Sequence, residues 1–142
     1  MIREKIFMTT FKDAEELYKV IGSFFGVLAD DPNIGKKLLD SKLKIRFNYR
    51  EPDSNIAIDL TGDAVKVFCG SSDFVPDVEM SMKADTAHKF WQGQVNLIIA
   101  LARREITAKG PIPKILKLLP IIKPSYAMYG PHLERLGFSS HV

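Results

Sequence analysis

The sequence predicts an α+β fold in which helices pack on a five-stranded, mostly antiparallel sheet. Between Phe11 and Leu28, apolar residues recur at three- and four-residue steps, which is typical of an amphipathic helix. Between Leu43 and Lys83 they alternate with polar residues, which is typical of strands with one buried face. After Asp85 the chain consists of short apolar segments separated by glycine and proline, which predicts short helices.

The composition is that of a globular protein with a sizeable core. With 142 residues, 46% hydrophobic and 26% charged, the chain is expected to form one domain over residues 1–142. Its one cysteine excludes an internal disulfide framework and a cysteine-based zinc site. There is no apolar signal-peptide run at the N-terminus, and the longest apolar run, 97–102, is too short to span a membrane. We therefore expect a cytoplasmic protein.

The N-terminal helices are expected within residues 10–40. Thr10 and Asp13 resemble a capping box, in which the first residue accepts a hydrogen bond from the new helix. Asp31 followed by Pro32 is typical of a second helix start, because proline suits the first helical position.

Four strands are expected in close succession within residues 43–84. Gly62 and Asp63 are typical of a tight two-residue hairpin, so the sheet is expected to be antiparallel. Cys69 falls on the apolar side of its strand and is expected to be a buried, unreactive thiol. The alternation in Ile106–Lys109 adds a fifth strand.

Residues 85–138 are expected to form short helices around that fifth strand, followed by proline-rich helices. Asp85 and Asn96 are suitable caps for two short helices, and Gly93 can end the first of them. Pro120 is expected to end a short helix and Pro131 to kink or break the last one, because proline removes a backbone donor.

Charge is unevenly divided along the chain. Residues 1–84 carry 12 Lys/Arg and 14 Asp/Glu, a net charge of −2, whereas residues 85–142 carry 8 and 3, a net charge of +5. A weak contact with anionic membranes is predicted where lysines surround an apolar patch. The lysines are Lys109, Lys114, Lys117 and Lys123, and the patch is Ile115, Leu116, Leu118 and Leu119. A solvated basic face is the alternative, and no dense basic cluster or motif indicates nucleic acid.

No catalytic constellation or cofactor motif is visible. Asp85 and His88 lie three residues apart on a predicted helix, but two ligands alone make a poor metal site. A helix cap beside an exposed histidine is the simpler interpretation. Hydrolase, P-loop, dinucleotide and zinc signatures are absent. We therefore expect no enzyme, no metal and no cofactor.

One stretch of the chain resembles the sterol carrier protein type 2 family. In that family a strand such as 78–85 enters a short helix, followed by a glycine, a second short helix and an edge strand. Trp91-Gln92-Gly93, Asn96 and 106–110 follow the same sequence of events. The resemblance covers the chain from about Leu43 onward. It implies a five-stranded sheet covered by helices, with an apolar tunnel that binds fatty acyl chains, sterols or related lipids.

The resemblance predicts non-enzymatic binding and carriage of a fatty acyl, sterol-like or isoprenoid lipid. The side chains expected to line the tunnel are Met80, Met82, Phe90, Trp91, Leu97, Ile98, Leu101, Ile115, Leu119, Ile122 and Tyr126. One alternative is a dimerising or substrate-presenting module that works with a separate enzyme. Such a module is expected to form a homodimer. Another is a small enzyme for a hydrophobic substrate. Apolar patterning alone does not distinguish a ligand tunnel from a dry core.

Overall fold

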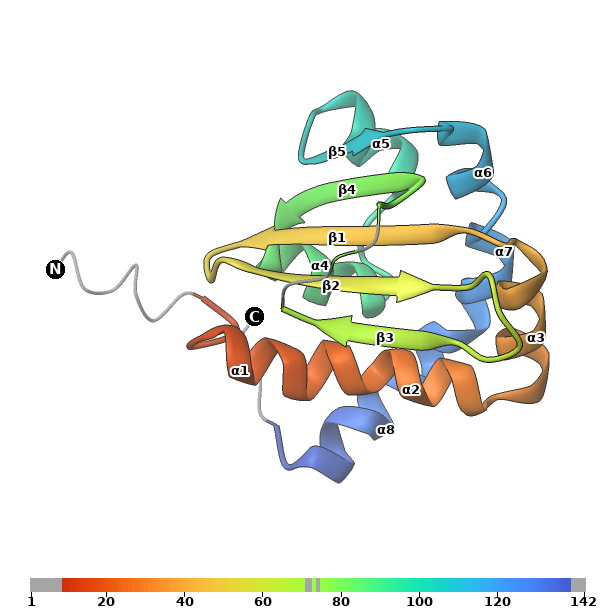
Figure 1. Ribbon diagram of the computed structural model, residues 1–142. Helices are drawn as coiled ribbons and strands as arrows, with labels where there is room; N and C mark the ends of the chain where they lie inside the picture. Colours follow the sequence, from red (N-terminus) through yellow and green to blue (C-terminus); the bar gives the residue numbers. More distant parts are fainter. Residues whose placement is uncertain (1–8, 71–72, 74, 139–142) are drawn as a thin grey trace, which may run out of the picture.

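The computed structural model describes residues 9–70, 73 and 75–138, and Figure 1 shows how its helices surround one sheet. The sheet has the order β3-β2-β1-β4-β5. Its strands are β1 Lys44–Arg50, β2 Ser54–Asp59, β3 Lys66–Cys69, β4 Val78–Lys83 and β5 Ile106–Lys109. The helices are α1 Ala14–Leu17, the π-helical turn η2 Tyr18–Gly22, α2 Ser23–Asp30, α3 Pro32–Asp40, α4 Ala84–Trp91, α5 Leu97–Ala102, α6 Ile112–Leu116, α7 Leu119–Ile122, the 3-10 turn η3 Lys123–Ser125 and α8 Tyr126–Leu136. No helix in this part of the chain is long and apolar enough to cross a membrane.

The sheet contains one parallel pair, at its centre. β1 is antiparallel to β2, but it runs parallel to β4, with Phe47 opposite Met80 and Tyr49 opposite Met82. β3 ends at the opposite end of the sheet from the start of β4, so these two strands are not joined as a hairpin (Figure 1). The expectation that the first four strands form a wholly antiparallel sheet is therefore wrong for the pair β1 and β4. The predicted fifth strand, β5, lies antiparallel beside β4.

The β2–β3 connection is not the tight hairpin predicted at Gly62. β2 ends at Asp59, and the Asp59 carboxylate accepts a hydrogen bond from the backbone N–H of Thr61 at 2.9 Å. This local bond turns the chain away from the ladder. β3 is a short edge strand, and for that reason Cys69 is exposed rather than buried as predicted.

The first helix starts later than predicted and widens in its middle. Asp13 is the cap, since its carboxylate accepts from the N–H of Glu16 at 2.9 Å. The N–H of Thr10 instead donates to the carboxylate of Asp85 at 2.8 Å, so the chain start is attached to α4. Asp85 is thus not the predicted cap, because α4 begins one residue before it. The π-helical turn η2 interrupts an otherwise α-helical stripe.

The C-terminal prolines Pro120 and Pro131 lie within helices rather than at their ends. Pro120 lies in the first turn of α7, where its missing N–H breaks no hydrogen bond. Pro131 lies inside α8, which nevertheless continues unbroken to Leu136. The carbonyl group that loses its partner there belongs to the exposed residue Ala127, where water can replace the bond. The predicted helix end at Pro120 is therefore wrong, and Pro131 does not break the last helix.

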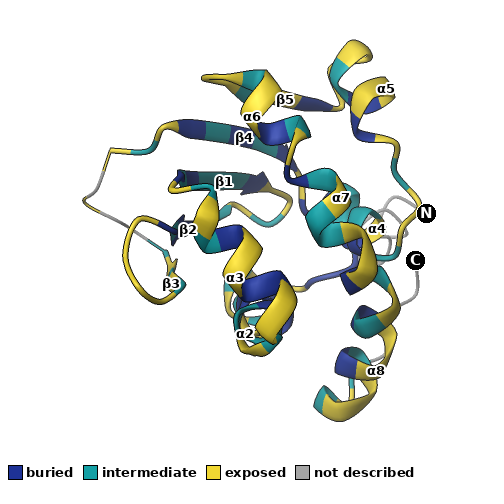
Figure 2. Cartoon of the chain, turned by 90° about the vertical axis from the view of Figure 1, so that its right-hand side faces the viewer, coloured by how far each residue is buried: buried dark blue, intermediate teal, exposed yellow. Residues whose placement is uncertain are grey.

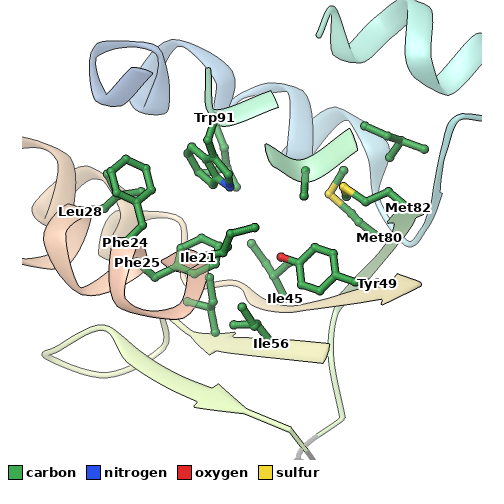
Figure 3. Packing of buried hydrophobic residues seen from close by; sticks show 14 of the residues in the cluster. Ile21, Phe24, Phe25, Leu28, Ile45, Tyr49, Ile56, Met80, Met82 and Trp91 are labelled. Atoms are coloured by element: carbon green, nitrogen blue, oxygen red, sulfur yellow. The ribbon is translucent and has the colours of Figure 1, made fainter. Parts of the chain in front are cut away.

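The core forms where the helices meet one face of the sheet (Figures 2 and 3). Phe25 of α2 stacks on Phe47 of β1, and its ring also meets the edge of Trp91 of α4, both at 5.6 Å between ring centroids. These contacts join α2, α4 and the sheet around one apolar interior.

Candidate ligand cavity

An apolar cavity of about 90 Å³ lies between the sheet and the helices. Its lining residues are Phe25, Leu28, Leu38, Ile45, Phe47, Tyr49, Ile58, Leu60, Val65, Met80, Met82, Ala87, Phe90, Trp91, Leu97, Ile106, Ile115, Leu118, Leu119 and Ile122. No charged side chain from the described part of the chain is among them. An apolar cavity of about 150 Å³ holds benzene, so a long-chain lipid requires one wall of this cavity to move outward.

The two walls of the cavity differ in regularity. The sheet wall is a hydrogen-bonded ladder whose inward residues, such as Ile45 and Met80, are buried. The opposite wall includes α6 and α7, helices of five and four residues, with Pro111, Pro113 and Pro120 at or within their first turns. Few backbone hydrogen bonds hold such short helices, so we expect this wall to open first.

Most of the predicted lining residues lie at the cavity. They are Met80, Met82, Phe90, Trp91, Leu97, Ile115, Leu119 and Ile122. Tyr126 lies beside this group rather than in it, because its ring packs on the edge of Phe90 at 5.7 Å and against Gly93.

The expectation that Ile98 and Leu101 face the cavity is not met. Asn96 caps α5 as predicted, accepting from the N–H of Ile99 at 3.1 Å. This start directs Leu97 and Ala100 inward, so Leu101 is half-buried and Ile98 is 62% exposed. In a run of consecutive apolar residues, the helix start decides which of them are buried.

The sequence model of the SCP-2 sterol transfer family matches residues 26–123. This chain belongs to the SCP-2 family. The predicted resemblance is thereby confirmed, although no curated protein matches the chain.

Solved structures share the SCP-2 fold at low identity. Sterol carrier protein domain 2 of Helicoverpa armigera is 17% identical, over 77% of this chain and 89% of that one, with a TM-score of 0.61. The palmitated SCP2L2 of Aedes aegypti is 19% identical, over 75% and 93%, with a TM-score of 0.54. The sec-alkylsulfatase Pisa1 of a Pseudomonas species is 17% identical, over 69% of this chain but 15% of that one, with a TM-score of 0.59. These similarities confirm the predicted α+β fold.

Sequence reasoning missed the part of the SCP-2 cavity that β1 provides. Ile45, Phe47 and Tyr49 share the inward face of β1, and the parallel register places the last two opposite Met80 and Met82. The alternation along β1 already identified these side chains as one face. The missing information was that β4 is its neighbour in the sheet.

The two described histidines of this SCP-2 chain are buried outside the cavity lining. His88 was expected to be exposed, but its Nδ1 lies 2.7 Å from the hydroxyl oxygen of Tyr129, within hydrogen-bonding distance. His132 Nε2 lies 2.9 Å from Ser23 Oγ and 3.0 Å from the carbonyl oxygen of Val20. Burial lowers the pKa of His88 to about 4, against the opposing effect of the Asp85 charge, and it also lowers the pKa of His132. Both histidines are therefore neutral at pH 7 and attach α8 to the helices beneath it.

The residues described here contain no cluster of three or more histidine, cysteine or acidic side chains that could hold a metal. His88 is instead paired with a phenol, and Asp85 with the N–H of Thr10. Their positions fit structural roles.

The apolar patch predicted for membrane contact is only partly exposed. Ile115 and Leu118 are buried and line the cavity, and Leu116 and Leu119 are half-buried. The surrounding lysines are exposed, as expected. Ile115 of α6 and Leu119 of α7 thus belong to the cavity wall, whereas Leu116 is not among the lining residues.

Proposed function

We propose that this SCP-2 protein binds and carries a hydrophobic ligand, a fatty acyl, sterol-like or isoprenoid lipid, without chemical conversion. The observation that carries the proposal is the cavity with apolar walls between sheet and helices. The ligand site becomes a tunnel when the α6–α7 wall moves outward. The palmitated state of the Aedes aegypti structure supports an acyl chain as one suitable ligand.

The expected affinity follows from the buried chain length. Burial contributes about 0.8 kcal/mol per methylene, so a chain of roughly sixteen carbons gains on the order of 10 kcal/mol. Association and wall opening oppose this by several kcal/mol, which leaves a dissociation constant in the micromolar range.

The test begins with the purified protein. Mass spectrometry of an organic extract identifies any lipid that is carried through purification, and a fluorescent fatty acid is then titrated into the delipidated protein. We expect a saturable signal. Absence of saturation below about 100 μM, a limit set by the affinity estimate, with this fatty acid and also with an uncharged fluorescent alkyl probe contradicts the proposal.

We also propose that the protein collects its ligand by transient contact with anionic membranes through the outer face of α5. Ile98 and Ile99 are exposed there, and Arg103 follows Ile99 by one turn on the same face. No acidic residue occurs between Asp85 and Glu105. Two isoleucines cover too little area for a stable protein dimer, but shallow insertion next to cations suits a peripheral membrane contact.

This location brings the cavity close to the lipid surface. α5 has six residues, and Leu97 on its inner side lines the cavity while Ile98 and Ile99 face outward. The exposed Lys109 and Lys114 lie on the neighbouring β5 and α6, at the same end of the molecule (Figures 1 and 2).

A second candidate function is a dimerising or substrate-presenting module that works with a separate enzyme. It is favoured by the match to the alkylsulfatase, in which the shared fold is a small part of a larger chain. Sedimentation velocity separates the two candidates when it is combined with lipid extraction. A stable homodimer from which no lipid is extracted favours the module, and a lipid-loaded protein favours the carrier.

A further inference from the structure

Two polar side-chain groups adjoin the otherwise apolar cavity. They are the hydroxyl of Tyr49 on β1 and the indole N–H of Trp91 on α4, and both residues line the cavity. Both are deeply buried, with 6% and 5% of their surface exposed. In Figure 3, the Tyr49 hydroxyl and the Trp91 nitrogen point into the space between the sheet and the helices.

Neither group has a hydrogen-bond partner within residues 9–70, 73 and 75–138. An unpaired buried donor destabilises a folded protein, and buried hydroxyl and indole groups normally find a partner. Phenylalanine at either position would keep the apolar contacts without this cost. A polar group that remains unpaired in a ligand cavity is therefore explained by a partner that arrives with the ligand.

The chemistry of the two groups restricts the ligand. The indole N–H only donates, whereas a neutral phenol both donates and accepts. Burial raises the pKa of Tyr49, so its hydroxyl stays protonated. No lysine, arginine or histidine lines the cavity in the described chain, so a buried carboxylate would lack a counter-charge.

We propose that Tyr49 and Trp91 bind the oxygen atom of a neutral lipid that carries a hydroxyl or carbonyl group, and that the cavity selects such lipids over carboxylates. A carbonyl oxygen has two lone pairs and can accept from either donor, and the phenol can also accept from an alcohol. The inference rests on the proposed function and adds to it the polar end of the ligand.

The test compares ligands of equal chain length as competitors of a fluorescent alkyl probe. These are 1-dodecanol, 2-dodecanone, dodecanoate at pH 8 and dodecane. We expect the wild type to bind the alcohol and the ketone about tenfold more tightly than dodecane, as one or two neutral hydrogen bonds allow. Tyr49→Phe should remove most of the preference for the alcohol, and Trp91→Phe should reduce that for the ketone. The matched control Tyr126→Phe, beside the cavity, should change neither.

Each outcome has one meaning. Equal affinity of the alcohol, the ketone and dodecane overturns the inference but leaves the carrier function intact, whereas no displacement by any of the four compounds contradicts both. Tighter binding of dodecanoate than of dodecanol also overturns it. In the ligand-free protein, Tyr49→Phe should unfold at the same or a higher denaturant concentration. A marked loss of stability would show that the hydroxyl has a partner in the protein, which overturns the inference as well.

Discussion

The cavity and the packed core next to it are built from the same kinds of side chain. We define the α8 core as Phe11, Phe24, His88, Tyr129 and His132. It adjoins the cavity directly, since Phe24 meets Trp91 edge to face at 5.2 Å. In the α8 core the imidazoles have partners, one in Tyr129 and the other in the backbone of η2. In the cavity, the phenol and the indole have none among the described residues.

The difference separates these two regions, although buried side-chain atoms without a partner in the described chain also occur outside the cavity, at Thr10 Oγ1, Asn55 Oδ1 and Gln92 Oε1. A dry core satisfies its buried polar groups internally, because unpaired ones are costly. A ligand site can leave its buried polar groups unpaired until a bound ligand supplies their hydrogen-bond partner. Hydrophobic composition is the same in both regions and does not separate them. The following predictions test this distinction, from the largest expected effect on stability to the smallest.

The largest effect is expected from truncation in the α8 core. Phe24→Ala should lower the free energy of unfolding by about 3–5 kcal/mol, since the ring is fully buried against Trp91, Tyr129 and His132. Leu119→Ala, in the cavity wall, should cost about 1 kcal/mol, because its side chain already adjoins empty space and is half-buried. Urea unfolding of both variants gives the comparison. Equal losses would show that the cavity is as tightly packed as the core.

Acidification should act on the α8 core and not on the cavity. The pKa of His88 is lowered to about 4 in the folded state, so its contribution to stability is complete above about pH 6.5 and is lost as the pH falls toward 4. The lowered pKa of His132 acts in the same direction. We expect a loss of about 2 kcal/mol from His88.

Urea midpoints at pH 7.5, 6.0 and 4.5 measure this dependence. His88→Gln keeps an acceptor for the Tyr129 hydroxyl but removes the titrating group, so its pH dependence should be weaker than that of the wild type. An unchanged dependence would assign the effect to other groups.

Overpacking should have opposite consequences in the cavity and at a close-packed position of the interior outside it. Leu119→Trp places an indole in the cavity, so stability should change by about 1 kcal/mol or less while uptake of the fluorescent fatty acid falls. Leu17→Trp makes the same exchange at a fully buried position and should cost about 1–3 kcal/mol or more. If Leu119→Trp is stable and still binds the fatty acid normally, this side chain does not line the ligand site.

The smallest effect on stability is expected at the exposed face of α5. Ile98→Ser combined with Ile99→Ser should change the free energy of unfolding by about 0.5 kcal/mol or less, because both side chains are largely exposed. Co-sedimentation with phosphatidylglycerol–phosphatidylcholine vesicles should nevertheless fall strongly. Val75→Ser, at an 81% exposed position on another connection, is the control and should bind vesicles like the wild type. Binding that is unchanged in the double variant, or that is equal at low and high salt, contradicts the membrane contact.

Local patterns allowed prediction of the strands and of their inward faces. The alternation through Ile45, Phe47 and Tyr49 holds whichever strand lies next to them, because side-chain direction in a strand is a local property. The Asn96 cap is also a local feature, since the N–H group that it accepts from belongs to Ile99, three positions away.

Features that depend on distant partners could not be predicted in this way. The parallel pairing of β1 with β4 joins strands that are far apart in the sequence. His88 is buried because Tyr129, 41 residues later, packs on it, and no feature near His88 in the sequence indicates this. The prediction of which face of α5 points inward failed for another reason. A run of apolar residues longer than one helical turn fits more than one rotation of the helix.

The small size of the cavity has a consequence for the rate of lipid exchange. At about 90 Å³ it cannot hold a long chain while closed, so uptake has to wait for the α6–α7 wall to open. If the open form makes up about 1% of the ligand-free protein, the apparent affinity is about a hundredfold weaker than that of the open form. The observed uptake rate should then level off at high lipid concentration, at the rate at which the wall opens. This limiting rate belongs to the ligand-free protein, so lipids with different polar ends should share it and differ instead in how fast they leave.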